Sequence, residues 1–106
     1  MLHLQILLKK EVLNLSKELL LKTSEIETYP SVHEWLKERL SLSEHYGANL
    51  DALWDELSGN IQLPLTILWH DDANVGEQYT AITELFEEAA GEIDGIMFGY
   101  LLDDEQ

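Results

Sequence analysis

The sequence contains no cysteine, and its few basic residues are unevenly placed. The lack of cysteine excludes disulfides, thiolate metal sites and thiol nucleophiles, and it is typical of a protein that works in the reducing cytoplasm. All six lysines and arginines precede residue 40, so the rest of the chain carries only acidic charge. The formal net charge of −15 repels nucleic acid and anionic membranes and attracts a basic partner. An acidic surface can also serve solubility alone.

Long apolar runs and recognisable targeting or catalytic motifs are also missing. No apolar run approaches the ~20 residues of a membrane span. The first residues lack the basic start and the small-residue cleavage site of a signal peptide. There is no glycine-rich phosphate loop and no nucleophile elbow. With 106 residues the chain suffices for one modest core, and we expect a cytoplasmic, single-domain protein.

Strand and helix patterns alternate along the chain. Short apolar runs at residues 18–22, 63–69 and 96–101 predict strands. The run 63–69 is almost continuously apolar, which predicts a strand covered on both faces. Ser31 and Glu34 have the spacing of a capping box and predict a helix that begins there. A second helical pattern extends from about Glu77 to Gly91, where Gly91 or Gly95 could end it. The alternation indicates an α/β layer with parallel strands.

Residues 1–16 fit more than one conformation. Apolar residues alternate from Leu2 to Leu8 as in a strand, whereas Leu8, Val12 and Leu15 follow helical spacing. The segment is therefore an added strand, a helix or an N-terminal extension, and one helix that continues through residues 17–22 is a further alternative. We predict that residues 17–102 form the domain and that residues 103–106 form a frayed acidic tail.

The most informative stretch is residues 44–59. Gly47 permits a positive φ in a tight turn, and Asn49 can accept a backbone N–H and begin a helix. Gly59 can end that helix in the left-handed conformation. Asp51 and Asp55 lie one turn apart, and two like charges at this spacing cost a helix about 0.2–0.5 kcal/mol. A short helix that keeps such a pair of acids is expected to present it to a positively charged group.

The same helix has a clear apolar side. At about 100° per residue, one arc of the helix contains Leu50, Leu53, Trp54 and Leu57, and this arc would face a core. The two aspartates lie just past the Trp54 edge of this arc. We therefore expect Trp54 to be half core residue and half contact surface, since Trp is enriched at binding hot spots. Trp35 and Trp69 are interpreted as core residues.

Catalytic interpretations find less support in the residues. His70, Asp71 and Asp72 could ligate a metal, but three adjacent residues do not converge as spaced ligands do, so we predict an acidic loop. Asp51 and Asp55 could form an acid/base pair, but no apolar neighbour is placed to separate their pKa values. A metal-dependent hydrolase that uses Asp51, Asp55 and His70 stays an alternative. We predict a protein that is not an enzyme, with no metal and no cofactor.

The central run resembles the signature of the barstar family, the protein inhibitors of small bacterial ribonucleases. It reads Tyr46-Gly47-x-Asn49-Leu50-Asp51-Ala52-Leu53-Trp54-Asp55-x-Leu57-x-Gly59. The resemblance continues into Leu63-Pro64-Leu65, and residues 85–89 resemble the last helix of the family. It implies an α/β fold in which a small single-layer parallel sheet of three strands packs with about four helices.

The resemblance also implies roles for single residues. Asp55 would be the central anion, at the position of an RNA phosphate, Asp51 would support it, and Glu88 would engage a basic group from the neighbouring helix. The partner would be a basic bacterial ribonuclease of the extracellular type, bound 1:1 by a protein that is a monomer when free. The predicted partner-binding residues are His45, Gly47, Asn49, Leu50, Asp51, Trp54, Asp55, Gly59, Asn60, Leu85 and Glu88.

Two of these positions depart from the family pattern. His45 stands where the family inhibitor has a tyrosine, and Asn60 stands where it has a tryptophan. Both changes would alter the rim of the contact. The alternative interpretation is therefore an acidic interaction or immunity module for another basic partner or toxin.

Overall fold

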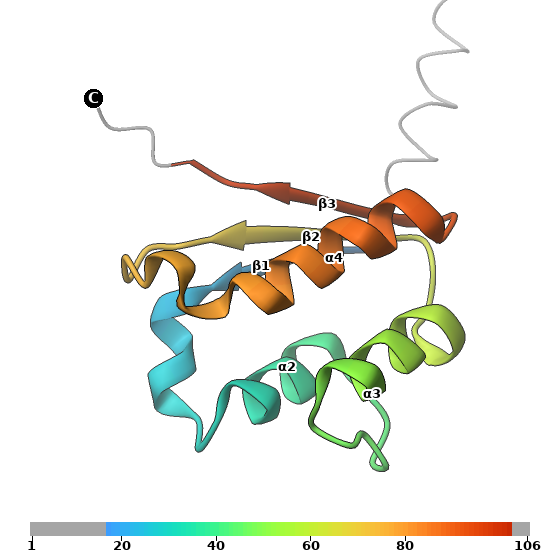
Figure 1. The fold of residues 1–106 in the computed structure, drawn as a ribbon, viewed down its shortest axis with the longest axis horizontal. Coiled ribbons are helices and arrows are strands. Elements are labelled where there is room, and N and C mark those ends of the chain that lie inside the picture. Colours follow the sequence, from blue (N-terminus) through green and yellow to red (C-terminus); the bar gives the residue numbers. More distant parts are fainter. Residues whose placement is uncertain (1–16, 103–106) are drawn as a thin grey trace, which may run out of the picture.

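The computed structural model describes residues 17–102, which form one three-stranded sheet with helices packed against it (Figure 1). Along the chain the elements are β1 (Lys17–Lys22), η1 (Thr23–Thr28), α2 (Val32–Leu40), α3 (Leu50–Asp55), η2 (Glu56–Asn60), β2 (Leu65–His70), η3 (Gly76–Tyr79), α4 (Thr80–Glu92) and β3 (Ile96–Tyr100). The strands are parallel and lie in the order β1-β2-β3. The predicted α/β fold with three parallel strands is confirmed. The expectations for residues 1–16 and for the tail 103–106 lie outside the described residues.

The sheet buries only one of its faces within residues 17–102. On β2, Leu65, Ile67 and Trp69 are buried in the core, whereas the residues between them are only partly buried. Leu21 of β1 and Ile96 of β3 continue the buried face. None of the outward positions on the three strands is fully buried. The prediction of a central strand covered on both faces is therefore wrong for this part of the chain.

Helix α2 begins where the sequence predicts. The Ser31 side chain accepts a hydrogen bond from the Glu34 N–H at 3.2 Å, which satisfies one of the free donors of the first turn. The helix buries Trp35, whose ring meets that of Trp69 edge-on at 5.7 Å. Both tryptophans are thus core residues, as predicted. Among the helices of residues 17–102, none has the length and apolar character of a membrane span.

Helix α4 belongs to the carboxyl-terminal half of the chain and packs against the buried face of the sheet. It buries a periodic set of side chains, Ile82, Phe86 and Ala89. Gly91 lies inside the helix, which ends at Glu92. Gly95 has a φ of 98° in the turn to β3, and a Cβ there would lie 3.2 Å from Leu63 Cβ. The turn therefore needs glycine both for its φ and for the close approach.

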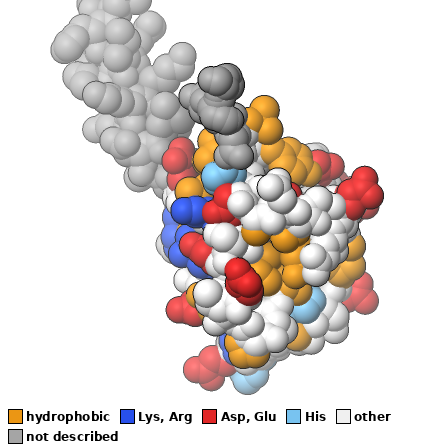
Figure 2. Space-filling model, turned by 90° about the vertical axis from the view of Figure 1, so that its left-hand side faces the viewer, with side chains coloured by type: hydrophobic (Ala, Val, Ile, Leu, Met, Phe, Trp, Pro, Cys, Tyr) orange, Lys and Arg blue, Asp and Glu red, His pale blue; other side chains and the backbone are white. Residues whose placement is uncertain are grey.

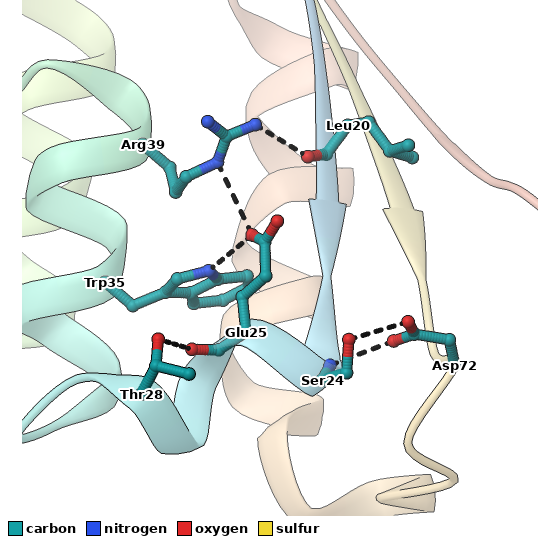
Figure 3. Close-up of polar contacts among 7 residues, drawn as sticks. All are labelled: Leu20, Ser24, Glu25, Thr28, Trp35, Arg39 and Asp72. Atoms are coloured by element: carbon teal, nitrogen blue, oxygen red, sulfur yellow. Dashed lines mark hydrogen bonds and ion pairs between the residues drawn. The ribbon is translucent and has the colours of Figure 1, made fainter.

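Two aspartates join the carboxyl ends of β1 and β2. Asp72 accepts hydrogen bonds from the Ser24 hydroxyl at 2.7 Å and the Ser24 N–H at 2.9 Å (Figure 3). Asp71 accepts from the Thr23 hydroxyl at 2.8 Å and from two backbone N–H groups of its own loop. Burial acts to raise the pKa of Asp71, but these hydrogen bonds outweigh it and hold the pKa below its usual range. Both carboxylates thus brace the loop that the sequence predicted to be acidic.

Candidate functional site

The acids of α3 stand on a helix that is held firmly at its start and along its buried side. The Asn49 side chain accepts a hydrogen bond from the Ala52 N–H at 2.7 Å, which confirms the predicted cap. Leu53 is fully buried and fixes the helix to the core. Asp51 and Asp55 are exposed, and within residues 17–102 neither side-chain carboxylate has a hydrogen-bond or ion-pair partner. The helix therefore offers two free carboxylates on a rigid support.

Three expectations about this segment are wrong in detail. The positive φ lies at Ala48 (60°) and not at Gly47. Gly47 instead allows a close approach, because a Cβ there would lie 3.2 Å from Ala52 Cβ. Gly59 does not end the helix in the left-handed conformation, because the chain continues as the π-helical turn η2. Leu50 does not join the core, since 39% of it stays exposed.

A groove between α3 and α4 brings acidic and apolar side chains together. Its volume is about 360 Å³, and its lining residues are Leu50, Asp51, Trp54, Ala81, Glu84, Leu85 and Glu88. Trp54 is half-buried and packs against the core, as predicted. Carboxylates only accept hydrogen bonds when ionised, so three of them around an apolar floor suit a cation with several N–H donors. Arginine has this chemistry, because its planar guanidinium pairs with carboxylates and stacks on aromatic rings.

The loop before α3 is tied to the helix by a buried acid. Glu56 is 6% exposed, and it accepts hydrogen bonds from the Ser43 hydroxyl at 2.6 Å and the Ser43 N–H at 3.2 Å. The Ser43 hydroxyl is the main cause that holds the pKa of Glu56 below its usual range, against the effect of burial. Smaller effects in the same direction come from the Asn60 side chain and from the charge of His45. Glu56 thus links both ends of the candidate site.

A second contact ties the same loop to α2. The Tyr46 hydroxyl lies 2.6 Å from Nδ1 of His33, with the two rings 5.7 Å apart. Burial lowers the pKa of His33, which favours the neutral ring that can accept this hydrogen bond. Burial also raises the pKa of Tyr46 to about 12, so the hydroxyl keeps its proton. The loop that carries His45 and Gly47 is therefore fastened from two sides.

The charge around the site is strongly unbalanced. Arg39 donates to the Leu20 carbonyl at 2.9 Å and pairs with Glu25 at 3.6 Å, and Glu25 also accepts from the Trp35 indole (Figure 3). This arginine is thus engaged at β1 and η1. From Leu40 onward, which includes α3 and α4, the chain has acidic residues but no lysine or arginine. Figure 2 views the η1 side of the molecule rather than α3, and on that face too acidic side chains are spread widely while lysine and arginine lie mainly along one side. A basic partner therefore meets an acidic surface.

Comparison with known proteins agrees with this geometry. Residues 16–103 match the family described as Barstar (barnase inhibitor). The chain belongs to the barstar family. One curated relative is named "Putative ribonuclease inhibitor YrdF" and comes from Bacillus subtilis (strain 168). It is 31% identical over 81 residues, which cover 73% of this chain and 89% of the relative. The resemblance inferred from residues 46–59 is thereby confirmed.

Within this barstar-family fold, the predicted contact residues fall into two groups. The groove collects Leu50, Asp51, Trp54, Leu85 and Glu88. The others are exposed on α3 or around the two ends of its helical segment: His45, Gly47, Asn49, Asp55, Gly59 and Asn60. Asn60 also lines a separate depression of about 210 Å³ beside β1, together with Leu40 and Ser41. Apart from Leu85 and Glu88 of α4, the predicted residues lie in one stretch of chain, residues 45–60, but they do not line one pocket.

Two residues of the site were not found by sequence reasoning. Glu84 precedes Glu88 by one helical turn on α4, and this i, i+4 spacing is the signal that could have found it. For Glu56 the signal in the sequence was its position between Asp55 and the core residue Leu57. Local residue spacing does not reveal the contact between α4 and α3. It also does not reveal the hydrogen bonds between Ser43 and Glu56.

Replacing Glu56 with glutamine is expected to destabilise the folded chain by about 1–3 kcal/mol at neutral pH, because Ser43 loses a charged acceptor. The folded pKa of Glu56 lies below its ordinary value of 4.5. Its stabilisation is therefore complete above that value and is lost as the pH falls through the lowered one. Urea denaturation across this range should show the largest difference from wild type near neutral pH and a shrinking one in acid.

Glu44→Gln is the matched control for this measurement, because Glu44 is exposed in the same loop. It should follow the wild-type stability at every pH. A Glu56→Gln variant as stable as the wild type at neutral pH would show that the Ser43–Glu56 contact does not hold the loop.

Proposed function

We propose that this protein inhibits a basic ribonuclease by placing the carboxylates of α3 where the phosphates of RNA would bind. The observation that carries the proposal is the pair Asp51 and Asp55, exposed and unpartnered within residues 17–102, on a capped helix with a buried anchor. Membership of the barstar family supports the same role, and so does the relative named as a ribonuclease inhibitor.

The chemistry of the target explains why carboxylates can block it. An enzyme that cleaves RNA lines its cleft with Arg, Lys and His side chains that hold phosphate oxygens. Carboxylate oxygens satisfy the same donors, yet they carry no phosphodiester bond that can be cleaved. Asp55 serves as the central anion, Asp51 supports it, and Glu88 receives a basic group in the α3–α4 groove. Because the helix is already ordered, little conformational entropy is lost on binding.

The acidic charge is proposed to speed the encounter with the ribonuclease. Opposite net charges raise association rates, and salt screens exposed charges with a Debye length of about 10 Å at 0.1 M. We expect the association rate, measured by stopped-flow fluorescence, to fall at least about tenfold between 0.05 and 0.5 M salt. The dissociation rate should change much less. An association rate that is independent of salt would contradict electrostatic steering.

The partner itself is best found with a panel of small basic bacterial ribonucleases assayed with purified protein. We propose a cytoplasmic inhibitor that is a monomer when free and forms a 1:1 complex. His45 and Asn60, at the rim, are proposed to select which ribonuclease is bound. Inhibition of at least one enzyme at equimolar concentration is the expected result. If no ribonuclease of the panel is inhibited, that result favours the alternative, an acidic immunity module that binds another basic partner.

A further inference from the structure

The loop between α2 and α3 has a single aromatic anchor and lies on the side of the molecule away from the sheet (Figure 1). Across residues 44–51, Tyr46 is the one side chain that is not exposed. It packs against the core, and its N–H donates to the Ser43 carbonyl at 3.1 Å. The exposed residues on either side of it, His45 and Gly47, belong to the proposed contact surface. The position of this part of the surface therefore depends on how firmly Tyr46 is held.

The backbone that follows Tyr46 needs support from both sides. Ala48 has a φ of 60°, a left-handed conformation that a residue other than glycine adopts only at a cost in energy. Such a conformation persists where the surrounding structure determines it. On one side the Asn49 side chain is held by the Ala52 N–H at 2.7 Å, and on the other side Tyr46 is the fixed point. Together these two residues determine where α3 begins, and Asp51 lies two residues beyond the cap.

The hydroxyl of Tyr46 is held in turn by α2. It lies 2.6 Å from Nδ1 of His33, which belongs to the first turn of that helix. Trp35 and Leu36, the fully buried residues of the same turn, fix the helix to the core, so the imidazole stands on a rigid support. His33 itself does not line the α3–α4 groove. Its effect on the proposed contact surface therefore passes through Tyr46.

We propose that His33 is a positioning residue for ribonuclease binding, which holds the loop through Tyr46 and so sets the start of the helix that presents Asp51 and Asp55. This inference rests on the proposed function as a ribonuclease inhibitor. A loop that is ordered before contact loses less conformational entropy on binding. When the link is broken, only the molecules whose loop is in place can bind, and the apparent affinity falls with their fraction.

The direction of the hydrogen bond makes this link depend on pH. Burial, with a smaller effect from the charge of Glu56, raises the pKa of Tyr46 to about 12, so the phenol keeps its proton and donates it to Nδ1. Only the neutral imidazole of His33 can accept, because protonation turns Nδ1 into a donor. Burial lowers the pKa of His33 from its ordinary value of 6.5. The link is therefore complete above that ordinary value and is lost as the pH falls from there through the lowered pKa.

Other titratable groups surround the contact. Glu56 on η2 acts on the phenol, and its own pKa lies below the ordinary value of 4.5, so its charge is constant while the imidazole titrates. Glu34 and Lys37 carry opposite charges on the same helix as His33. His45 places a second imidazole on the loop. The test must therefore change His33 itself and compare variants at each pH.

Two variants separate the acceptor from the ring. His33→Asn keeps an acceptor, because the amide oxygen is as many bonds from Cα as Nδ1 is, and it does not titrate. His33→Leu fills similar space without an acceptor. In the free protein, the hydrogen-bonded amides of Tyr46 and Ala52 should exchange about 2- to 13-fold faster in His33→Leu and as in wild type in His33→Asn. The Leu65 amide, bonded to the Gly95 carbonyl at 2.7 Å, is the internal control and should not change.

The same variants are then titrated calorimetrically against a ribonuclease of the panel that the wild type inhibits. At pH 7.5 the affinity of His33→Leu should be at least about twofold lower, and His33→Asn should restore it. Tyr46→Phe should match His33→Leu, and the double variant should lose no more than either alone, because both remove the same bond. Between about pH 7.5 and 5, the wild type should approach His33→Leu, while the ratio of His33→Asn to His33→Leu stays constant. These ratios cancel the titration of the enzyme.

Unchanged exchange of the Tyr46 and Ala52 amides in His33→Leu would overturn the proposal, and so would an equal acceleration at Leu65, which would mean a general loss of stability. Faster exchange with unchanged affinity would reduce the link to a structural contact and overturn the binding role. Failure of the proposed inhibition gives a different result: the wild type and all variants would inhibit no ribonuclease, which removes the binding role, while the two amides would still respond to the substitution at His33.

Discussion

Replacing Asp55 with alanine is expected to weaken ribonuclease binding by about 30-fold to several thousand-fold, or about 2–5 kcal/mol of binding free energy. In the complex this carboxylate would face the cations that hold an RNA phosphate. Removing it leaves those cations buried without an anion, and most of the loss comes from their unpaired charge. The effect should appear chiefly as faster dissociation.

The fold should survive this change. Asp55 is exposed, and exposed substitutions usually alter stability by less than about 0.5 kcal/mol. Removing it also relieves the repulsion from Asp51, which is worth about 0.2–0.5 kcal/mol. Titration calorimetry gives the affinity, and urea denaturation gives the stability. Glu27→Ala, an exposed acid on η1, is the control that should leave both unchanged. Full inhibition by the Asp55→Ala variant would refute the proposed anion role.

Reversing two charges of the α3–α4 groove, Asp51→Lys together with Glu88→Lys, is expected to reduce affinity by at least about a hundredfold. Like charges brought together at an interface cost several kcal/mol, and the reversal would set two lysines against a cationic cleft. Both the association rate and the lifetime of the complex should fall. Because Asp51 and Glu88 share one groove, their substitutions are close enough to be coupled.

The control for this reversal keeps the same net charge but moves it elsewhere. Glu27→Lys with Glu77→Lys places two lysines on η1 and η3, on the side of the molecule away from α3 (Figure 1). This variant should lose only the part of the association rate that depends on total charge. Surface plasmon resonance at two salt concentrations separates the contributions. Equal losses from both double variants would assign the effect to net charge and remove the groove from the contact.

Local sequence patterns predicted most of the secondary structure for physical reasons that act over a few residues. Ser31 and Asn49 begin their helices because a side-chain oxygen can reach an N–H of the first turn. The glycines were harder to interpret. Gly47 and Gly59 were expected to take positive φ values, but one provides space for Ala52 and the other lies in a π-helical turn. A glycine in the sequence shows that a positive φ is possible at that position, but it does not show that the folded chain adopts one.

The site was predicted to the extent that it lies on one segment. Asp51 and Asp55 share a side of a single helix, and their spacing alone places them together. Their exposure agrees with the expectation, while their role in binding stays a prediction. Glu84 and Glu56 were missed because each depends on a partner distant in the chain.

The sequence by itself determined the order of strands and helices, the caps of α2 and α3, and the acidic pair on α3. These features follow from hydrophobic periodicity and from hydrogen bonds that span three or four residues. Only the tertiary structure decided that α4 supplies two more carboxylates to the groove, that Glu56 is buried against Ser43, and that one face of the sheet stays open within residues 17–102. These features depend on how distant elements pack, and packing minimises exposed apolar area over the whole molecule rather than along any one segment.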